Sequence, residues 1–113
     1  MNTSNIPNPI TLTIEGKTYT LEFNRNSVAS AERAGLNLSL ITTAPMNTIP
    51  LLFYAAFKMH QPWITRDETD KILFDVLGGL KQEEVQRLGE LYAAPTNALL
   101  NDGGERKNAT ISL

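Results

Sequence analysis

Two short stretches near the start of the chain alternate between apolar and polar residues. Residues 10–14 have Ile or Leu at every even position, and residues 19–23 have Tyr, Leu and Phe at every odd position. A period of two is typical of a β-strand that buries one face. The pattern predicts a β-hairpin with a two-residue loop at positions 16–17, of which the first is glycine. This loop would place Ile14 opposite Tyr19 on the apolar face.

After the second stretch the spacing of apolar residues becomes helical. Residues 27–34 are favourable for a short helix, Asn26 is a suitable N-cap, and Gly35 is placed to end it. Residues 37–44 are rich in Leu, Ile and Thr without a clear period. We therefore expect a two-turn helix, followed by a loop or an irregular helical segment.

The next predicted helix is unusually apolar. Thr48 can cap it, Pro50 is tolerated in its first turn, and Pro62 ends it after about His60. Between residues 49 and 59 apolar side chains cover every side of this helix. A helix of this kind is either buried all round or partly covered by another chain, and the sequence leaves both possibilities open.

Two amphipathic helices complete the predicted fold. Thr65 and Glu68 have the spacing of a capping box, and the glycines at 78–79 would close the helix that the box begins. Its apolar stripe consists of Ile72, Leu73, Val76 and Leu77. The last helix is expected over residues 81–94, with Pro95 as its end.

These elements predict an α+β domain in which an N-terminal β-hairpin packs on a small bundle of three to four helices. A chain of 113 residues is long enough for one such domain. We expect the domain to span residues 10–100, with a flexible N-terminus at 1–9 and a flexible polar tail at 101–113.

The charge and composition argue against several classes of function. Ten basic and twelve acidic residues give a net charge of −2 without a basic cluster, so we expect no nucleic-acid partner. The longest uncharged apolar stretch, residues 49–57, is too short to cross a membrane. The first residues lack the features of a secretory signal, and the predicted location is the cytoplasm.

No pattern in the sequence predicts catalysis. The absence of cysteine excludes thiolate chemistry. The single histidine, His60, is separated from the nearest carboxylates, Asp67 and Glu68, by a proline that ends its helix. No nucleophile elbow or phosphate-binding loop is present. We therefore expect no enzyme activity, no metal and no cofactor.

What remains is an apolar surface for a partner or for self-association. Trp63 lies in a loop between two predicted helices, and Trp is favoured at interfaces. The alternative is that Trp63 covers the core over the helix ends. With the apolar helix, it gives the candidate contact residues Leu51, Phe53, Tyr54, Phe57 and Trp63.

The order of these features resembles the tail assembly chaperones of long-tailed bacteriophages and prophages with flexible, non-contractile tails. The resemblance covers about residues 10–94. It rests on the spacing of Asn26, Glu32 and Gly35 and on the segment from Gln61 to Glu68, in which Pro62 and Thr65 follow at fixed intervals.

The resemblance implies a non-enzymatic assembly factor in the bacterial cytoplasm that is absent from the mature virion. Such proteins bind the helical tape-measure protein, keep it soluble and help to recruit tail-tube subunits. A homo-oligomer is also expected. Two alternatives remain: a head–tail or tail completion protein retained in the virion, or, less favoured by the charge, a small helical regulator.

Overall fold

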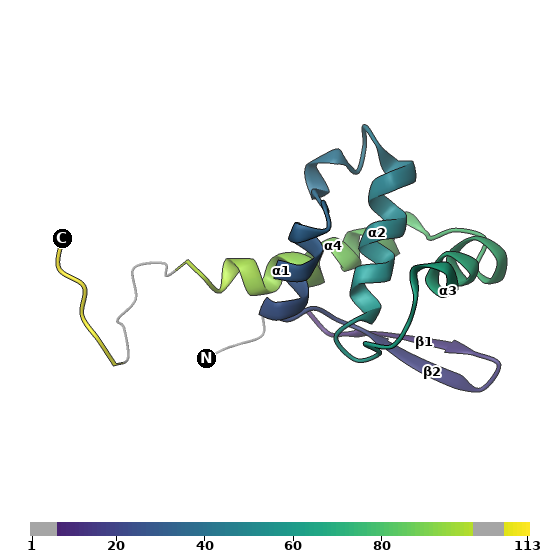
Figure 1. The fold of residues 1–113 in the computed structure, drawn as a ribbon, viewed down its shortest axis with the longest axis horizontal. Helices are drawn as coiled ribbons and strands as arrows, with labels where there is room; N and C mark the ends of the chain where they lie inside the picture. The colour runs from purple at the N-terminus through teal and green to yellow at the C-terminus, as the bar shows by residue number, and fades with distance from the viewer. Residues whose placement is uncertain (1–6, 101–107) are drawn as a thin grey trace.

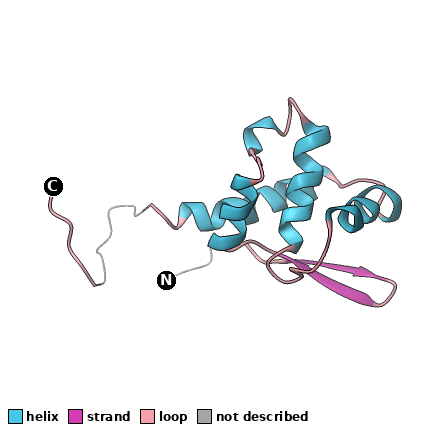
Figure 2. Ribbon diagram, in the orientation of Figure 1, coloured by secondary structure: helices cyan, strands magenta, loops and turns pink. Residues whose placement is uncertain are grey.

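The computed structural model describes residues 7–100 and 108–113 and confirms the predicted α+β class (Figures 1 and 2). A two-stranded antiparallel hairpin lies along one side of a group of helices. The predictions of flexibility for residues 1–6 and 101–107 lie outside the described residues. The elements in order are β1 (Ile10–Ile14), β2 (Lys17–Leu21), α1 (Arg25–Arg33), the 3₁₀ turn η1 (Leu38–Leu40), α2 (Pro45–Phe57), α3 (Arg66–Lys71), the π-helical segment η2 (Ile72–Val76) and α4 (Gln82–Asn97).

The hairpin loop lies one residue earlier than predicted. Glu15 and Gly16 form it, with φ of 49° and 82°, and two consecutive positive φ values match the twist of a tight hairpin. Ile14 therefore pairs with Lys17, not with Tyr19. The register differs from the predicted one by two residues, and because side chains alternate with a period of two, the predicted apolar face is retained.

Helix α1 begins earlier than predicted and ends where predicted. Asn24 is the N-cap, because Ser27 stands at the third helical position and completes a reciprocal pair of bonds: the Ser27 N–H donates to Asn24 Oδ1 at 2.8 Å, and the Asn24 N–H donates to Ser27 Oγ at 2.9 Å. At the other end Gly35 has a φ of 98°, and the Leu36 N–H donates to the Ala31 carbonyl. This is the Schellman arrangement.

Helix α2 differs from its prediction at both ends. It begins at Pro45, which fits the first helical position because its missing N–H would be unpaired there. Thr48 is consequently a buried residue inside the helix and not its cap. Pro50 also lies inside, where it removes only the bond to the carbonyl of Met46 in the exposed first turn. The helix ends at Phe57, earlier than predicted.

The predicted apolar stripe of the third helix is only half correct. Ile72 and Leu73 are buried, whereas Val76 and Leu77 are exposed. The reason is η2, in which the Leu77 N–H donates to the carbonyl of Ile72, five residues back instead of four. The wider turn shifts later side chains away from the core-facing line. The glycines at 78–79 end the segment with positive φ, as predicted.

Helix α4 continues through Pro95, contrary to the prediction that this residue ends it. The fixed φ of proline is compatible with a helix, and its cost is the lost bond to the carbonyl of Leu91. Only the last turn follows, held by a bond from the Ala98 N–H to the Ala94 carbonyl. The prediction failed because one missing donor near a helix end can be tolerated.

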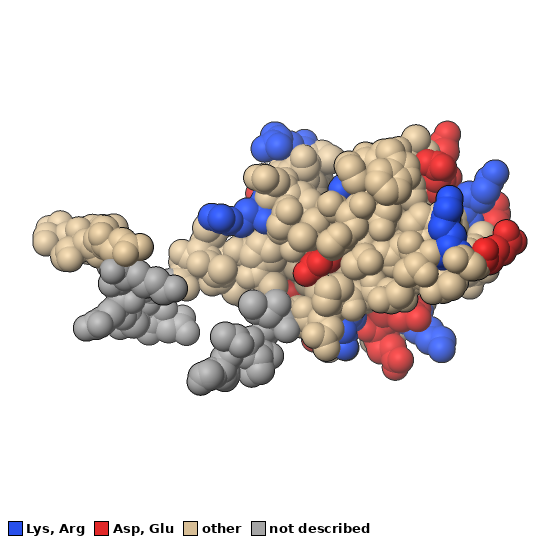
Figure 3. Space-filling model, turned by 90° about the horizontal axis from the view of Figure 1, so that it is seen from below, with Lys and Arg blue, Asp and Glu red and all other residues tan. Residues whose placement is uncertain are grey.

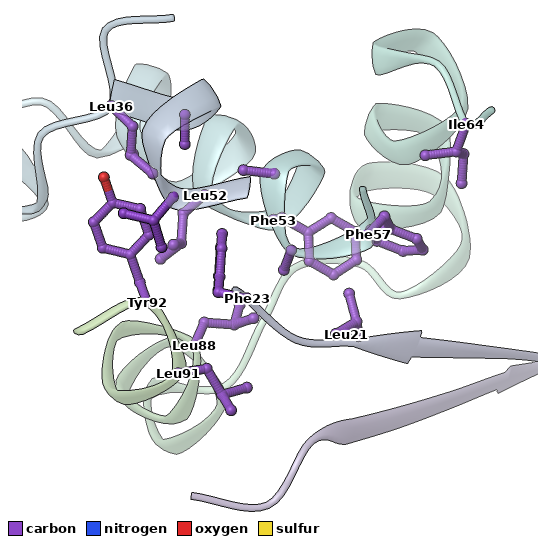
Figure 4. Close-up of a cluster of buried hydrophobic side chains, with 14 of the residues drawn as sticks. Leu21, Phe23, Leu36, Leu52, Phe53, Phe57, Ile64, Leu88, Leu91 and Tyr92 are labelled. Atoms are coloured by element: carbon purple, nitrogen blue, oxygen red, sulfur yellow. The ribbon is translucent and has the colours of Figure 1, made fainter. Parts of the chain in front are cut away.

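The core is built around α2 (Figure 4). Phe57 is in edge-on contact with Phe53 and with Tyr19, at 5.0 and 5.5 Å between ring centroids, and Phe23 packs edge-on against Tyr92 of α4 at 5.1 Å. Aromatic pairs prefer this geometry. Helix α2 packs against α1, α3, α4 and β2. A single chain therefore buries most of the apolar surface of α2.

Candidate partner-binding surface

The five contact residues predicted from the sequence separate into three groups. Phe53 and Phe57 are buried in the core, so their side chains cannot meet a partner in this conformation. Leu51 and Tyr54 are half-buried beside α1. Trp63 is 71% exposed and does not cover the core. The structure thus does not bring the five together, and only the last three can contribute to a surface.

Leu51 and Tyr54 line a cleft of about 460 Å³ between α1 and α2. The α1 wall is formed by small side chains, Ser27, Ser30, Ala31 and Ala34. On the α2 wall the Lys58 ammonium lies 5.3 Å from the centre of the Tyr54 ring, within cation–π range. The cleft is therefore partly polar, and it lacks the continuous apolar lining that favours binding of a large apolar side chain.

The loop that carries Trp63 is held firmly at its start by Gln61. The buried Gln61 side chain accepts a hydrogen bond from the Thr20 N–H at 2.9 Å and donates to the carbonyls of Thr20 at 3.0 Å and Phe57 at 2.9 Å. All of its polar atoms are thereby paired within the protein. Gln61, which stands out in the sequence only for its place before Pro62, therefore connects the hairpin to α2.

The same loop is also held at its middle and at its end. Lys58 Nζ donates to the carbonyls of Pro62 at 2.6 Å and Ile64 at 3.2 Å. The predicted capping box follows: Thr65 Oγ1 accepts from the Glu68 N–H at 3.2 Å, and the Glu68 carboxylate accepts from the Thr65 N–H at 2.9 Å. The backbone bond lowers the pKa of Glu68 most, and the bond from the Thr65 hydroxyl lowers that pKa further. Trp63 is thus an exposed aromatic on a loop with little freedom.

A second surface lies at the opposite end of α2, in a pocket of about 200 Å³ that we call the apolar pocket. It is bounded by the start of α2, by η2 and by the start of α4. Its lining residues are Pro45, Met46, Ile49, Pro50, Leu73, Phe74, Gly79, Leu80 and Val85. At the rim, Met46 is 75% exposed and Phe74 is 50% exposed, so the pocket opens to solvent between two large apolar side chains.

The apolar pocket can bind an apolar group but offers no acid, base or nucleophile. No lining residue is titratable. A cavity of 150 Å³ lined by apolar residues holds a benzene ring, so about 200 Å³ accommodates one large side chain of a partner. Met at the rim suits this use, since its flexible thioether adapts to irregular surfaces.

Sequence reasoning missed Met46 and Phe74. Met46 precedes the predicted start of α2, and Phe74 falls outside the predicted stripe of the third helix. One signal was available: Phe74 is a large aromatic residue outside the apolar stripe of its helix, and such a residue is expected to be exposed and available for contacts. The π-helical segment that presents Phe74 has no such indication in the residue pattern.

Charges on the described surface are mixed. Figure 3 shows Lys and Arg side chains interspersed with Asp and Glu around one face, with no field of a single sign. His60 Nε2 lies 2.8 Å from the Glu22 carboxylate, and Arg66 pairs with Asp70 at 3.1 Å. Within residues 7–100 and 108–113, no helix has the length and apolar character that a membrane crossing requires.

Comparison with known proteins assigns the chain to a family. No curated protein and no solved structure matches it. One family model, described as a domain of unknown function, matches residues 4–113, nearly the whole sequence. The chain therefore belongs to the family of the domain of unknown function DUF5055.

Proposed function

We propose that this protein is an assembly chaperone that binds an amphipathic helix of another protein and keeps it soluble. The observation that carries the proposal is the apolar pocket, open to solvent between Met46 and Phe74. A monomer seldom leaves such side chains at the rim of an apolar hollow without a use for them. The absence of any titratable group from its lining supports a binding role over a chemical one.

The pocket suits a helical partner. Its walls are the first turns of α2 and α4 and the widened turn η2, so it lies where three helical segments meet. A helix docks in such a groove by inserting apolar residues spaced three or four apart. One such residue would fill the hollow, and its neighbours would lie against Met46 and Phe74.

The resemblance to tail assembly chaperones supports a specific partner, the helical tape-measure protein of a long-tailed phage. A tape-measure helix exposes apolar stripes that aggregate before the tail tube encloses them, and a chaperone with an apolar pocket would cover part of such a stripe. Recruitment of tail-tube subunits is a second role that this resemblance supports.

Trp63 is the second contact candidate of the proposed function. A large aromatic on a fixed loop loses little conformational entropy when a partner covers it, and such residues often dominate binding energy. Trp63 follows the C-terminal end of α2, whereas the apolar pocket lies at the N-terminal end of the same helix. The two places would therefore contact separate segments of a long partner, and they can be tested separately.

The test is co-expression of the protein with the tape-measure protein of the same gene cluster. Three single variants are matched in exposure: Met46→Glu at 75%, Trp63→Glu at 71% and Leu99→Glu at 72%. The measurement is the soluble fraction of the tape-measure protein. We expect Met46→Glu to lower it severalfold, whereas Leu99→Glu, just past the end of α4 and away from the pocket, leaves it unchanged.

The outcomes separate the alternatives. Circular dichroism and thermal melting must first show that each variant is folded. If the folded Met46→Glu variant protects the tape-measure protein as well as the parent does, the pocket is not the contact site. If the parent itself gives no protection and is found in purified tail particles, the alternative of a completion protein retained in the virion replaces the chaperone.

Self-association remains a prediction, but a different surface now supports it. The sequence favoured it because the α2 helix is apolar on all sides, and the structure buries most of that helix within one chain. An apolar surface that a second copy would cover is the rim of the pocket, together with Val76 and Leu77, which are exposed in and just after η2. Light scattering at micromolar concentration of the parent and of Met46→Glu tests this contact.

A further inference from the structure

The two edges of the hairpin are treated differently by the rest of the protein. Along the outer edge of β2, the Thr20 N–H and carbonyl bond to the Gln61 side chain, and the Glu22 N–H donates to the Ala56 carbonyl at 3.0 Å. These bonds close the edge to another strand. Unpaired strand edges are sites for pairing, and proteins usually protect them.

The outer edge of β1 is open among the described residues. Antiparallel pairs alternate in the direction of their backbone groups. Thr20 points its groups away from β1, so Thr11, which stands opposite it, must point its own groups away from β2, as must Thr13. No hydrogen bond between described residues reaches either backbone, and the sheet has only two strands. The side chains of Ile10, Leu12 and Ile14 on the apolar face are themselves only partly covered.

The far end of the chain carries a segment with the pattern of a strand. Residues 109–113 read Ala-Thr-Ile-Ser-Leu, with apolar residues at every odd position and hydroxyl residues between them. The segment lies outside any helix or strand and is exposed, and Ile111 is 62% exposed. Five residues match the length of β1, whose sequence Ile-Thr-Leu-Thr-Ile follows the same alternation. A strand with one apolar face is stable only when that face packs against other apolar residues, and residues 109–113 have no such contact among the residues that the structure describes.

The chain leaves α4 close to the start of β1. Pro7, three residues before β1, lines a cleft together with Ala98, directly after α4. Arg87 of α4 also donates to the carbonyl of Asn8 at 3.1 Å. The ten residues from 99 to 108 can span up to about 33 Å when extended, and a strand of five residues is about 17 Å long. The segment can therefore reach the whole of the β1 edge.

We propose that residues 109–113 add to the outer edge of β1 of the same chain as a third strand. The backbone groups of Thr11 and Thr13 would bond to the added strand, while Ile111 and Leu113 would cover the exposed flanks of Leu12 and its neighbours. A short tether gives an effective concentration in the millimolar range, which favours the segment of the same chain over that of a second copy.

The cysteine-free sequence allows a direct test by disulfide trapping. Thr13→Cys is combined with Thr110→Cys or with Ser112→Cys, because these hydroxyl residues share the polar face of the proposed three-stranded sheet. The matched control replaces Thr13→Cys by Thr18→Cys. Thr18 stands opposite Thr13 on β2, one strand farther away, and two strand spacings of about 4.8 Å exceed the reach of a disulfide.

We expect at least one of the two Thr13 pairs to form an intrachain disulfide at micromolar concentration, about tenfold faster than its Thr18 control. Equal rates for the pair and its control, or no disulfide in either pair, would overturn the proposal. A disulfide found only between chains would overturn it in favour of strand exchange with a second copy.

Hydrogen exchange gives an independent readout on the chain without cysteines. The amides of Thr11 and Thr13 should exchange at least about tenfold faster when residues 109–113 are deleted, since they lose the partners of a paired strand. Ile111→Asp should have the same effect and Thr110→Asp a smaller one, because only Ile111 faces the core side. Unchanged exchange after the deletion contradicts the proposal.

Discussion

The two ends of α2 are held in different ways by the rest of the protein. At its C-terminal end, Gln61 and Lys58 join the helix, the hairpin and the following loop through paired hydrogen bonds. At its N-terminal end, the helix has no side-chain cap, begins with Pro45 and leaves Met46 in solvent beside the apolar pocket.

The difference indicates where the fold is secured and fits the binding site that we propose. A network whose polar groups are all satisfied is costly to break and gains nothing from a partner. An open apolar pocket contributes little to folding, and its rim is free to change contacts. We therefore expect substitutions at the C-terminal end to lower stability, and substitutions at the N-terminal end to lower binding with stability unchanged.

The largest effect is expected for Phe57→Ala at the secured end. Phe57 is fully buried and contacts Tyr19 and Phe53, so its truncation leaves a cavity and should lower the free energy of unfolding by about 3–5 kcal/mol. Urea unfolding followed by circular dichroism measures this. Phe57→Leu, which keeps most of the volume, should lose clearly less, and equal losses would mean that the cavity is not the cause.

Gln61→Ala is expected to come next, with a loss of about 2 kcal/mol, because the partly buried backbone groups of Thr20 and the Phe57 carbonyl lose a partner. Gln61→Glu is the matched variant. Its carboxylate retains the acceptor for the Thr20 N–H but has no N–H for the two carbonyls, so it should also destabilise. A Gln61→Glu protein as stable as the parent in urea would contradict the role assigned to the two donated bonds.

The sequence predicted local structure better than it predicted exposure. Two strands, the glycine at 35 and the capping box at Thr65 follow from backbone preferences that act over a few residues, and these predictions were confirmed. The end predicted at Pro95 was wrong, because the single lost bond falls in the last turn of α4. The start predicted at Thr48 was also wrong, since α2 begins at Pro45 and contains Thr48.

The candidate site was the least predictable part. Whether Phe53 or Trp63 is buried depends on which elements pack around α2, and the residue pattern of one helix does not contain that information. The exposure of Phe74 depends on the widened turn of η2, a feature of the packed structure. Of the predicted contact residues, Leu51, Tyr54 and Trp63 remain accessible to a partner, and the apolar pocket was found only in the structure.

Thr65→Ala tests the helix cap at the far end of the loop that follows α2. The variant removes the acceptor for the Glu68 N–H and should lower the free energy of unfolding by about 1 kcal/mol. Thr65→Ser keeps the hydroxyl and should stay close to the parent. Thermal denaturation compares the three proteins, and an unchanged melting temperature for Thr65→Ala would mean that the cap contributes nothing measurable.

The pH dependence of Glu68 sharpens the same point. Its folded-state pKa lies below the ordinary value of 4.5, because the charged form accepts the bonds from Thr65. A depressed pKa contributes stability above the unfolded value, and this stability is lost as the pH falls through the folded value. The melting temperatures of the parent and Glu68→Ala should therefore differ most at neutral pH, and the difference should shrink as the pH falls below 4.5 and through the lower folded-state pKa. A constant difference across this range would contradict the assignment.

The smallest effect on stability is expected for Met46→Glu at the open end. A side chain that is 75% exposed loses few contacts when replaced, so the free energy of unfolding should change by no more than about 0.5 kcal/mol. The same substitution places a charge at the mouth of the apolar pocket, where a partner's apolar side chain would have to desolvate it. Binding should therefore fall while melting does not. If Met46→Glu instead destabilises the fold as much as Gln61→Ala, the N-terminal end of α2 belongs to the structural core, and the contrast between the two ends is lost.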